Sequence, residues 1–300
     1  PRYGDYQAKA VWEINSRHRL TLLTLWGDDH NHPGRETAVA NKMLYYGNQD
    51  LFQGTTGLNW RALWGRHGYS QTALSWSTAG YAEDFRDTNS GQPLLHNRSG
   101  ERTLSLRSSS HLRLSGRHAL EFGLELRALN NHFDNRYSTA SEPAVPVKAT
   151  VTGIKAGLFM QHTARPLPGV TIILGVRADY FSRSGRASTS PRASLAWQID
   201  PLTKLSASAG IFRQTLPALL LARQPRQELQ DMHARHYIIG FERLLTADTK
   251  FSVEAYRKNY SRFPIAGSEP GLFIVDELVY SHGFYQNHGE LASAGEAYSR

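Results

Sequence analysis

The segment DDHNHPGRE places side chains that could hold a metal ion within five consecutive positions. Asp28 and Asp29 carry carboxylates, and His30 and His32 carry imidazoles two residues apart. In an extended segment residues i and i+2 point the same way, so the two imidazoles could share one cation. The alternative is a hydrated loop tip. We favour the loop tip because nothing nearby in the sequence supplies partners that would fix the ligands. We therefore predict no metal site and no cofactor.

No motif for enzymatic chemistry occurs in the chain. HExxH, GxSxG, a P-loop and a helix-opening GxGxxG are all absent. Cysteine is absent too, which excludes disulfides and thiolate-bound zinc or iron–sulfur clusters. The net charge is +8, but the basic residues are scattered among acidic ones, with no basic helix, aromatic RNA-binding box or zinc finger. We expect no catalytic residue, no enzymatic activity and no nucleic-acid partner.

A row of charged residues lies in the segment LRLSGRHALEFGLELRAL, where Glu121, Glu125 and Arg127 occupy odd positions. The even positions are apolar: Leu120, Phe122, Leu124, Leu126 and Ala128. Alternation with a period of two is typical of a β-strand with one apolar and one polar face. The apolar face could meet a soluble core or lipid. The polar row could bind a ligand or line the interior of a barrel.

The same alternation recurs in six hairpins and predicts about twelve strands of about ten residues. Short turns alternate with long polar connections, which we expect over about residues 27–56, 83–102, 130–152 and 261–290. Soluble β-sandwiches have connections of mixed length, whereas transmembrane barrels have short turns on one rim and long loops on the other. About ten residues also suffice for a tilted strand to cross a bilayer. The pattern therefore favours a barrel in a membrane, and lipid against its apolar face.

Several segments resemble the TonB-dependent receptors of bacterial outer membranes. KAGLFMQHTARPLPGVTIILGVRADYF, SPRASLAWQIDPLTKLSASAGIFRQTLP and HYIIGFER with VEAYRKNY are similar to successive strand pairs of that family. The residues that carry the likeness are Phe159, Gln161, Pro166, Gly175, Arg177, Asp179, Tyr180, Ser190, Pro191, Arg192, Gly210, Phe212, Gln214 and Pro217. The resemblance covers about residues 6–300. It implies an all-β fold, an antiparallel up-and-down transmembrane β-barrel with about twelve of the family's roughly 22 strands.

The resemblance also implies a domain organisation and a function. Residues 1–300 are expected to form a single barrel segment that lacks the family's plug domain and its C-terminal strands. The implied function is active uptake of a scarce nutrient, such as a ferric siderophore, across the outer membrane of a Gram-negative-type bacterium. The TonB–ExbB–ExbD system would supply the energy through the missing plug segment. A passive porin or adhesion barrel and a soluble all-β binding module remain as alternatives.

Site residues follow from the same resemblance. The extracellular loops would capture a small molecule, and aromatic and basic side chains suit that task. The loop candidates are Tyr45, Tyr46, His132, Arg136 and Tyr137. The lumen would be lined by Glu121, Glu125, Arg127, Arg177, Asp179 and Arg192. Outer-membrane lipid and lipopolysaccharide would surround the apolar face, on which we place Leu120, Phe122, Leu124 and Leu126.

Overall fold

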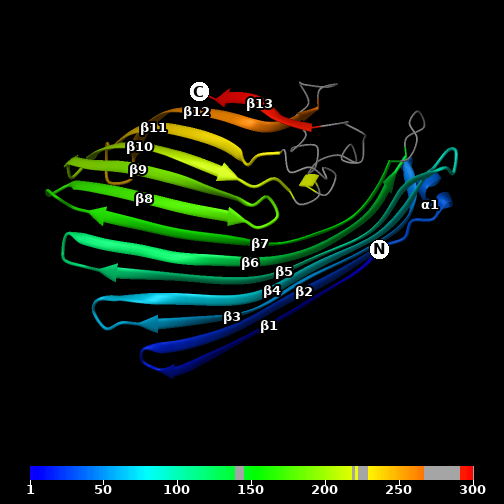
Figure 1. Ribbon diagram of the computed structural model, residues 1–300, viewed down its shortest axis with the longest axis horizontal. Helices are drawn as coiled ribbons and strands as arrows, with labels where there is room; N and C mark the ends of the chain where they lie inside the picture. Colours follow the sequence, from blue (N-terminus) through cyan, green and yellow to red (C-terminus); the bar gives the residue numbers. More distant parts are fainter. Residues whose placement is uncertain (139–144, 218–219, 222–228, 267–290, 300) are drawn as a thin grey trace.

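A computed structural model describes residues 1–138, 145–217, 220–221, 229–266 and 291–299. These residues form an antiparallel sheet of thirteen strands in which each strand pairs with the next along the chain (Figure 1). The strands are β1 (Arg2–Asn15), β2 (His18–Asn31), β3 (Tyr45–Leu63), β4 (Gly68–Asp87), β5 (Pro93–Arg113), β6 (His118–Tyr137), β7 (Val145–Ala164), β8 (Val170–Phe181), β9 (Arg186–Asp200), β10 (Thr203–Gln214), β11 (Met232–Leu244), β12 (Lys250–Ala266) and β13 (Leu291–Ser299). The antiparallel up-and-down order is the predicted one.

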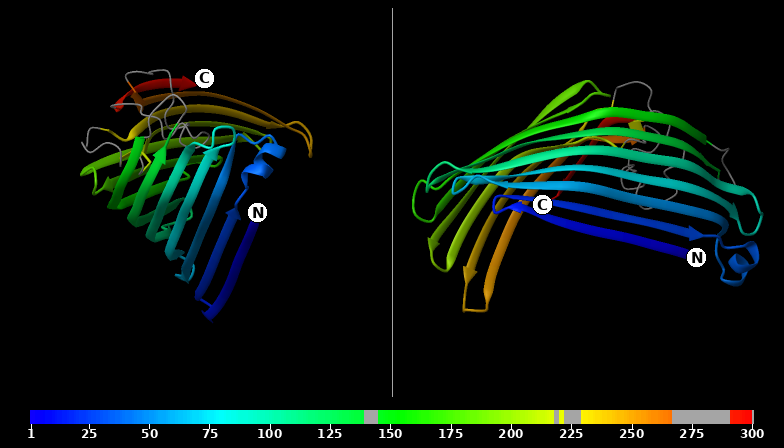
Figure 2. Two further views of the ribbon diagram at one scale, coloured as in Figure 1. Left: turned by 90° about the vertical axis from the view of Figure 1, so that its right-hand side faces the viewer. Right: turned by 90° about the horizontal axis from the view of Figure 1, so that it is seen from below.

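The sheet curls into an open trough, as the two views of Figure 2 show. Within the described residues β1 and β13 are the two edges of the sheet and do not pair with each other. The connection from β2 to β3 carries a short helix, α1 (Arg35–Ala40), at the rim of the trough. Among the described residues no helix is both long and apolar enough to cross a membrane.

The strand register extends the alternation of β6 across the sheet. Directly paired residues of an antiparallel sheet share a face. Leu126 pairs with Leu106 of β5, and the row continues without interruption through three further strands. Its next members are Leu74, Leu58 and Leu22. This row belongs to the face that carries most of the exposed apolar side chains. We call the zone of that face on either side of the leucine row the convex apolar band. The predicted assignment of Leu126 to an apolar face is confirmed.

Polar groups within the convex apolar band satisfy one another across strands. The hydroxyls of Thr24 and Thr56 are hydrogen bonded at 2.8 Å, and the indole Nε1 of Trp26 donates to Thr24 at 3.0 Å. Farther along the sheet, Thr72 and Ser108 form the same kind of pair at 2.9 Å. In an apolar medium an unpaired hydroxyl is costly, so this pairing makes polar residues compatible with an apolar face.

The opposite, concave face carries the odd-numbered residues of β2 to β8. Glu125 pairs with Arg107 of β5, and Arg127 pairs with Lys155 of β7, so charges gather on this side. Gly123 lies in the same row, and a Cβ there would meet the Ser108 carbonyl oxygen at 2.3 Å. Only glycine fits at that position, because the neighbouring backbone approaches too closely for a side chain.

Most of the polar segments expected to be loops are strand instead, which corrects the predicted loop lengths. Strand β4 runs to Asp87 and β5 begins at Pro93, so the connection expected over residues 83–102 is only residues 88–92. The 21 residues of β5 span about 70 Å, or about 50 Å along the normal at about 45° tilt, against an apolar band of about 25 Å. Where β5 extends beyond the apolar band, both of its faces carry polar residues, so apolar and polar residues no longer alternate along the sequence. Of the connection expected over residues 261–290, residues 267–290 lie outside the described ranges.

Candidate functional site

The concave face of β6 to β10 encloses a hollow of about 260 Å³, which we call the concave hollow. Its charged lining residues are Glu125, Arg127, Lys155, Arg177, Asp179, Arg186, Arg213 and Asp231. A second hollow of about 440 Å³ lies beside it and includes Glu121, Arg177 and Arg192 in its lining. The structure therefore brings the six predicted lumen residues to one face of the sheet. That this face encloses a lumen stays a prediction.

An ion-pair network joins β6 and β8 across the intervening β7. The Arg177 guanidinium donates through Nε to both Asp179 carboxylate oxygens at 2.9 Å, and its Nη2 lies 3.4 Å from Glu125 Oε2. Arg127 forms an ion pair with the other oxygen of Glu125. Gly157 of β7 sits between the partners, where a Cβ would lie 2.4 Å from Arg177 Nη2. A glycine at this point is what lets the guanidinium reach across a whole strand.

Positive charge exceeds negative charge in the concave hollow. Five cationic and three anionic side chains line it, an excess of two. The Nε of Arg213 is buried, and within the described part of the chain it has no hydrogen-bond partner. An unsatisfied buried guanidinium donor is unfavourable unless an acceptor reaches it. The hollow thus suits an anionic group of a ligand or of another protein segment.

Aromatic rings accompany the cations on the concave face. The Arg192 guanidinium lies 4.4 Å from the centroid of the Phe212 ring, and Lys155 Nζ lies 4.9 Å from that of Phe181. Both distances are within cation–π range. Glu121 lies apart from the network, with its carboxylate 3.6 Å from His111 Nε2. The predicted residues therefore form one cluster around Arg177 and two separate contacts.

The five loop candidates lie in strands, so their expected loop positions are wrong. Tyr45 and Tyr46 begin β3, and His132, Arg136 and Tyr137 belong to β6. His132 and Arg136 are exposed, while their neighbours Asn131 and Asn135 are buried on the concave side. The two exposed side chains therefore point away from the concave hollow. The ligand-binding role of all five residues stays a prediction.

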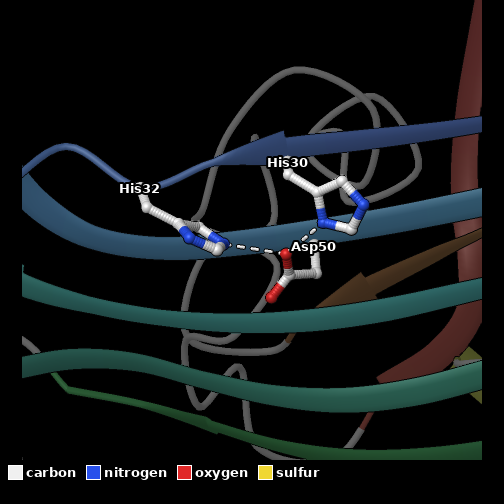
Figure 3. Close-up of side chains that lie close together, drawn as sticks. All are labelled: His30, His32 and Asp50. Carbon is white, nitrogen blue, oxygen red and sulfur yellow. Dashed lines mark hydrogen bonds and ion pairs between the residues drawn. The ribbon is translucent and has the colours of Figure 1, made fainter. Parts of the chain in front are cut away.

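A cluster of two histidines and an aspartate lies at the rim end of β2 and β3, as Figure 3 shows. His30 Nδ1 lies 2.5 Å from Asp50 Oδ1, and His32 Nε2 lies 2.8 Å from the same oxygen. The other ring nitrogen of His30 contacts Asp28 Oδ2 at 3.2 Å. The expectation that nothing holds these imidazoles is therefore wrong. Asp50 was missed because only the register His30↔Asp50 brings it near, and the sequence does not show that register.

Hydrogen bonding in this cluster shifts two pKa values in opposite directions. The hydrogen bond with Asp50 raises the pKa of His30, and the Asp28 carboxylate adds to the rise. The hydrogen bonds from His30 and then from His32 lower the pKa of the Asp50 carboxyl. Both shifts favour a carboxylate that is charged and enclosed by imidazoles.

An antiparallel up-and-down sheet with an apolar convex face and a polar, charged concave face is typical of the wall of an outer-membrane β-barrel. The family model described as "TonB dependent receptor-like, beta-barrel" matches residues 3–296. The chain therefore belongs to the TonB-dependent receptor family and is an outer-membrane protein, as the sequence predicts. No curated protein sequence matches the chain.

Solved structures with the same fold include siderophore receptors. A mutant of the ferric enterobactin receptor PfeA from Pseudomonas aeruginosa is 13% identical, with a TM-score of 0.71, over 87% of this chain and 43% of that one. The siderophore receptor PirA from Pseudomonas aeruginosa is 13% identical, with a TM-score of 0.70, over 99% and 51%. The alcaligin receptor FauA from Bordetella pertussis is 12% identical, with a TM-score of 0.65, over 99% and 48%. The chain thus spans about half the length of these structures, and the likeness shows the fold alone.

Proposed function

We propose that the chain forms part of the wall of a receptor that takes up a scarce, anionic nutrient, such as a ferric siderophore. The observation that carries this proposal is the composition of the concave hollow, in which cationic side chains outnumber anionic ones. Within the described residues the buried Nε of Arg213 has no hydrogen-bond acceptor there. Arginine binds carboxylate and phenolate oxygens well because its donors form a planar fork. Nearby aromatic rings such as Phe181 would add contact area for a planar ligand.

The comparisons support the nutrient class without identifying the ligand. The neighbouring structures are described as ferric enterobactin, siderophore and alcaligin receptors. Within the family, energy would come from TonB–ExbB–ExbD acting on a plug segment. The concave ion-pair network around Arg177 offers charges against which such a plug could pack. The passive porin and adhesion alternatives lack this energy coupling.

The convex face would meet the lipids of the outer membrane. Its apolar band includes Leu22, Leu58 and Leu74, and charged side chains such as Arg102 begin only beyond that band. Arg102 is exposed there and would pair with a phosphate of lipopolysaccharide. We therefore propose lipid contacts along the band and lipopolysaccharide contacts above it.

Uptake of radiolabelled iron tests the proposal. Cells that depend on this protein would be given ferric tris-catecholate or ferric tris-hydroxamate complexes, with and without a protonophore. Arg213→Gln should weaken binding of the transported complex about tenfold, because it removes a charge-assisted hydrogen bond. Arg102→Gln is the matched control on the convex face, away from the concave hollow, and should leave binding of the ferric complex unchanged. Uptake that persists after the proton gradient collapses would support a passive porin and refute the proposal.

A further inference from the structure

We propose that His30, His32 and Asp50 bind one divalent transition-metal cation of the zinc class on the convex face, beyond the apolar band. The site is independent of nutrient uptake, because Asp50 shares its face with Leu58 and not with the concave hollow. Two imidazoles and a carboxylate form a donor set that zinc-class ions favour.

Both imidazoles already direct a ring nitrogen at the same carboxylate oxygen, Asp50 Oδ1 (Figure 3). One nitrogen from each imidazole and one carboxylate oxygen lie within 4.8 Å of one another. Bonds of about 2.0–2.2 Å in tetrahedral geometry place neighbouring ligand atoms about 3.3 Å apart. The present contacts to Asp50 Oδ1 are 2.5 and 2.8 Å, so each imidazole nitrogen needs to move away from that oxygen by less than about 1 Å. The two nitrogens are at most 4.8 Å apart, so they need to approach each other by at most about 1.5 Å to share an ion. Rotations of exposed side chains supply such a movement without a change in the strands.

The backbone holds the two imidazoles on the same side. His30 and Asp50 are directly paired in the β2–β3 ladder. His32 precedes Pro33, and a residue before proline is restricted to extended conformations, so the strand alternation continues through His32. The carbonyl oxygen of Pro33 accepts a hydrogen bond from the Gly47 N–H at 3.1 Å, which anchors the end of the segment to β3. The geometry is therefore built into the rim of the sheet.

Asp28 contacts the ring nitrogen of His30 that is not used as a metal ligand. Its carboxylate lies 3.2 Å from His30 Nε2, the ring nitrogen that does not face Asp50. A carboxylate on the distal nitrogen fixes the tautomer and orientation of a metal-binding imidazole. The side chains of His30 and His32 are 41% and 49% exposed, so an ion can enter from solvent and the fourth coordination position stays open to water.

A nearby histidine–aspartate pair lacks these properties and serves as an internal control. His96 Nδ1 lies 2.6 Å from Asp84 Oδ1, but the second carboxylate oxygen is taken by the Arg98 guanidinium. A cation already neutralises that aspartate, and no second imidazole faces it among the described residues. Removing His96 therefore removes an imidazole of similar exposure without touching the proposed site.

Zinc titration of the untagged protein, purified in detergent and stripped with a chelator, tests the proposal. Competition with a chromophoric chelator should show one high-affinity Zn²⁺ per chain, which Mg²⁺ at equal concentration does not displace. His32→Ala should lower the affinity at least about 100-fold, and Asp50→Asn should do the same, whereas His96→Ala should leave it unchanged. Bound Zn²⁺ should also raise the thermal unfolding midpoint of the parent protein but not of His32→Ala.

Three results would overturn the proposal. They are no high-affinity zinc binding by the parent protein, equal affinity in His32→Ala, and an equal loss of affinity in His96→Ala. His32→Ala keeps the His30 contacts to Asp28 and Asp50, so it decides the matter even where Asp50→Asn does not fold. Uptake of the ferric complexes is measured separately with Arg213→Gln, so failure of either proposal leaves the other standing.

Discussion

Two adjacent leucines on β2 allow a direct test of which face meets lipid. Leu22 pairs with Ala10 and Leu58 on the convex face, whereas Leu23 pairs with Lys9 and Gly57 on the concave face. Their exposed fractions are 44% and 43%, so the two side chains differ in face and hardly at all in burial within the sheet. The test replaces each leucine in turn with arginine, as Leu22→Arg and Leu23→Arg.

The expected difference follows from the depth of Leu22. Tryptophan rings gather at the edges of the apolar band, so we take Trp26 as one edge. Leu22 lies four residues from Trp26, which is about 10 Å along the membrane normal at about 3.4 Å per residue and about 45° tilt. That depth is close to the middle of an apolar band about 25 Å tall, where arginine costs about 2–4 kcal/mol. Leu23→Arg faces the polar concave side and adds only repulsion from Lys9, about 1 kcal/mol or less.

The measurement is the free energy of unfolding of each variant in lipid vesicles, from denaturant titration followed by tryptophan fluorescence. We expect Leu22→Arg to lose about 1–3 kcal/mol more than Leu23→Arg. Repeating the pair in lipids of shorter chain length should reduce the difference, because the apolar band becomes thinner. Equal losses, or a larger loss for Leu23→Arg, would refute the assignment of the convex face to lipid.

Two further predictions concern the rim of the sheet. Gly47→Ala should destabilise the protein by about 1–3 kcal/mol in the same denaturation assay, because Gly47 has a φ of 144° and a Cβ would clash with the Asp84 carbonyl oxygen. Gly100→Ala is the control and should be nearly neutral, because its Cβ would meet no atom closer than 3.8 Å. Hydrogen bonds from the Ser90 backbone N–H and hydroxyl lower the pKa of Asp87 below its ordinary value of 3.8, so the charged carboxylate stabilises the fold fully above pH 3.8 and loses that effect as the pH falls through the lowered pKa. The difference in unfolding free energy between the parent protein and Asp87→Asn should therefore shrink in acid and vanish below the lowered pKa. A difference that stays constant across pH would contradict this account.

The membrane-spanning part of the fold could be predicted from residue alternation, while the rim could not. Leu120 to Leu126 reveal their face because one side of β6 is apolar and the other polar. In the extension of β5, around His96 and Arg98, both faces carry polar groups, so the alternation disappears and a strand looks like a loop. The same loss misplaced His132 and Arg136, which lie in β6.

In the candidate sites, too, the sequence predicts which residues share a face of one strand but not which residues meet across strands. Arg177 and Asp179 could be assigned to one face, because they stand two positions apart on a single strand. Their link to Glu125 depends on the register of β6, β7 and β8 and on Gly157, which the sequence does not specify. In the histidine cluster, His30 and Asp50 stand 20 positions apart, and the sequence does not show the register that brings them into contact.

The central claim, that the two faces of this sheet meet lipid and an aqueous interior, is tested most directly by accessibility along β2. The chain contains no cysteine, so single cysteines can be introduced and spin-labelled at each position from Leu20 to Leu25 in the protein reconstituted in bilayers. Both Leu22 and Leu23 are apolar, so sequence hydropathy alone does not fix the result. The account predicts that labels at positions 20, 22 and 24 collide mainly with oxygen, and those at 21, 23 and 25 mainly with a water-soluble nickel chelate. Collision rates that show no alternation, or the opposite phase, would contradict it.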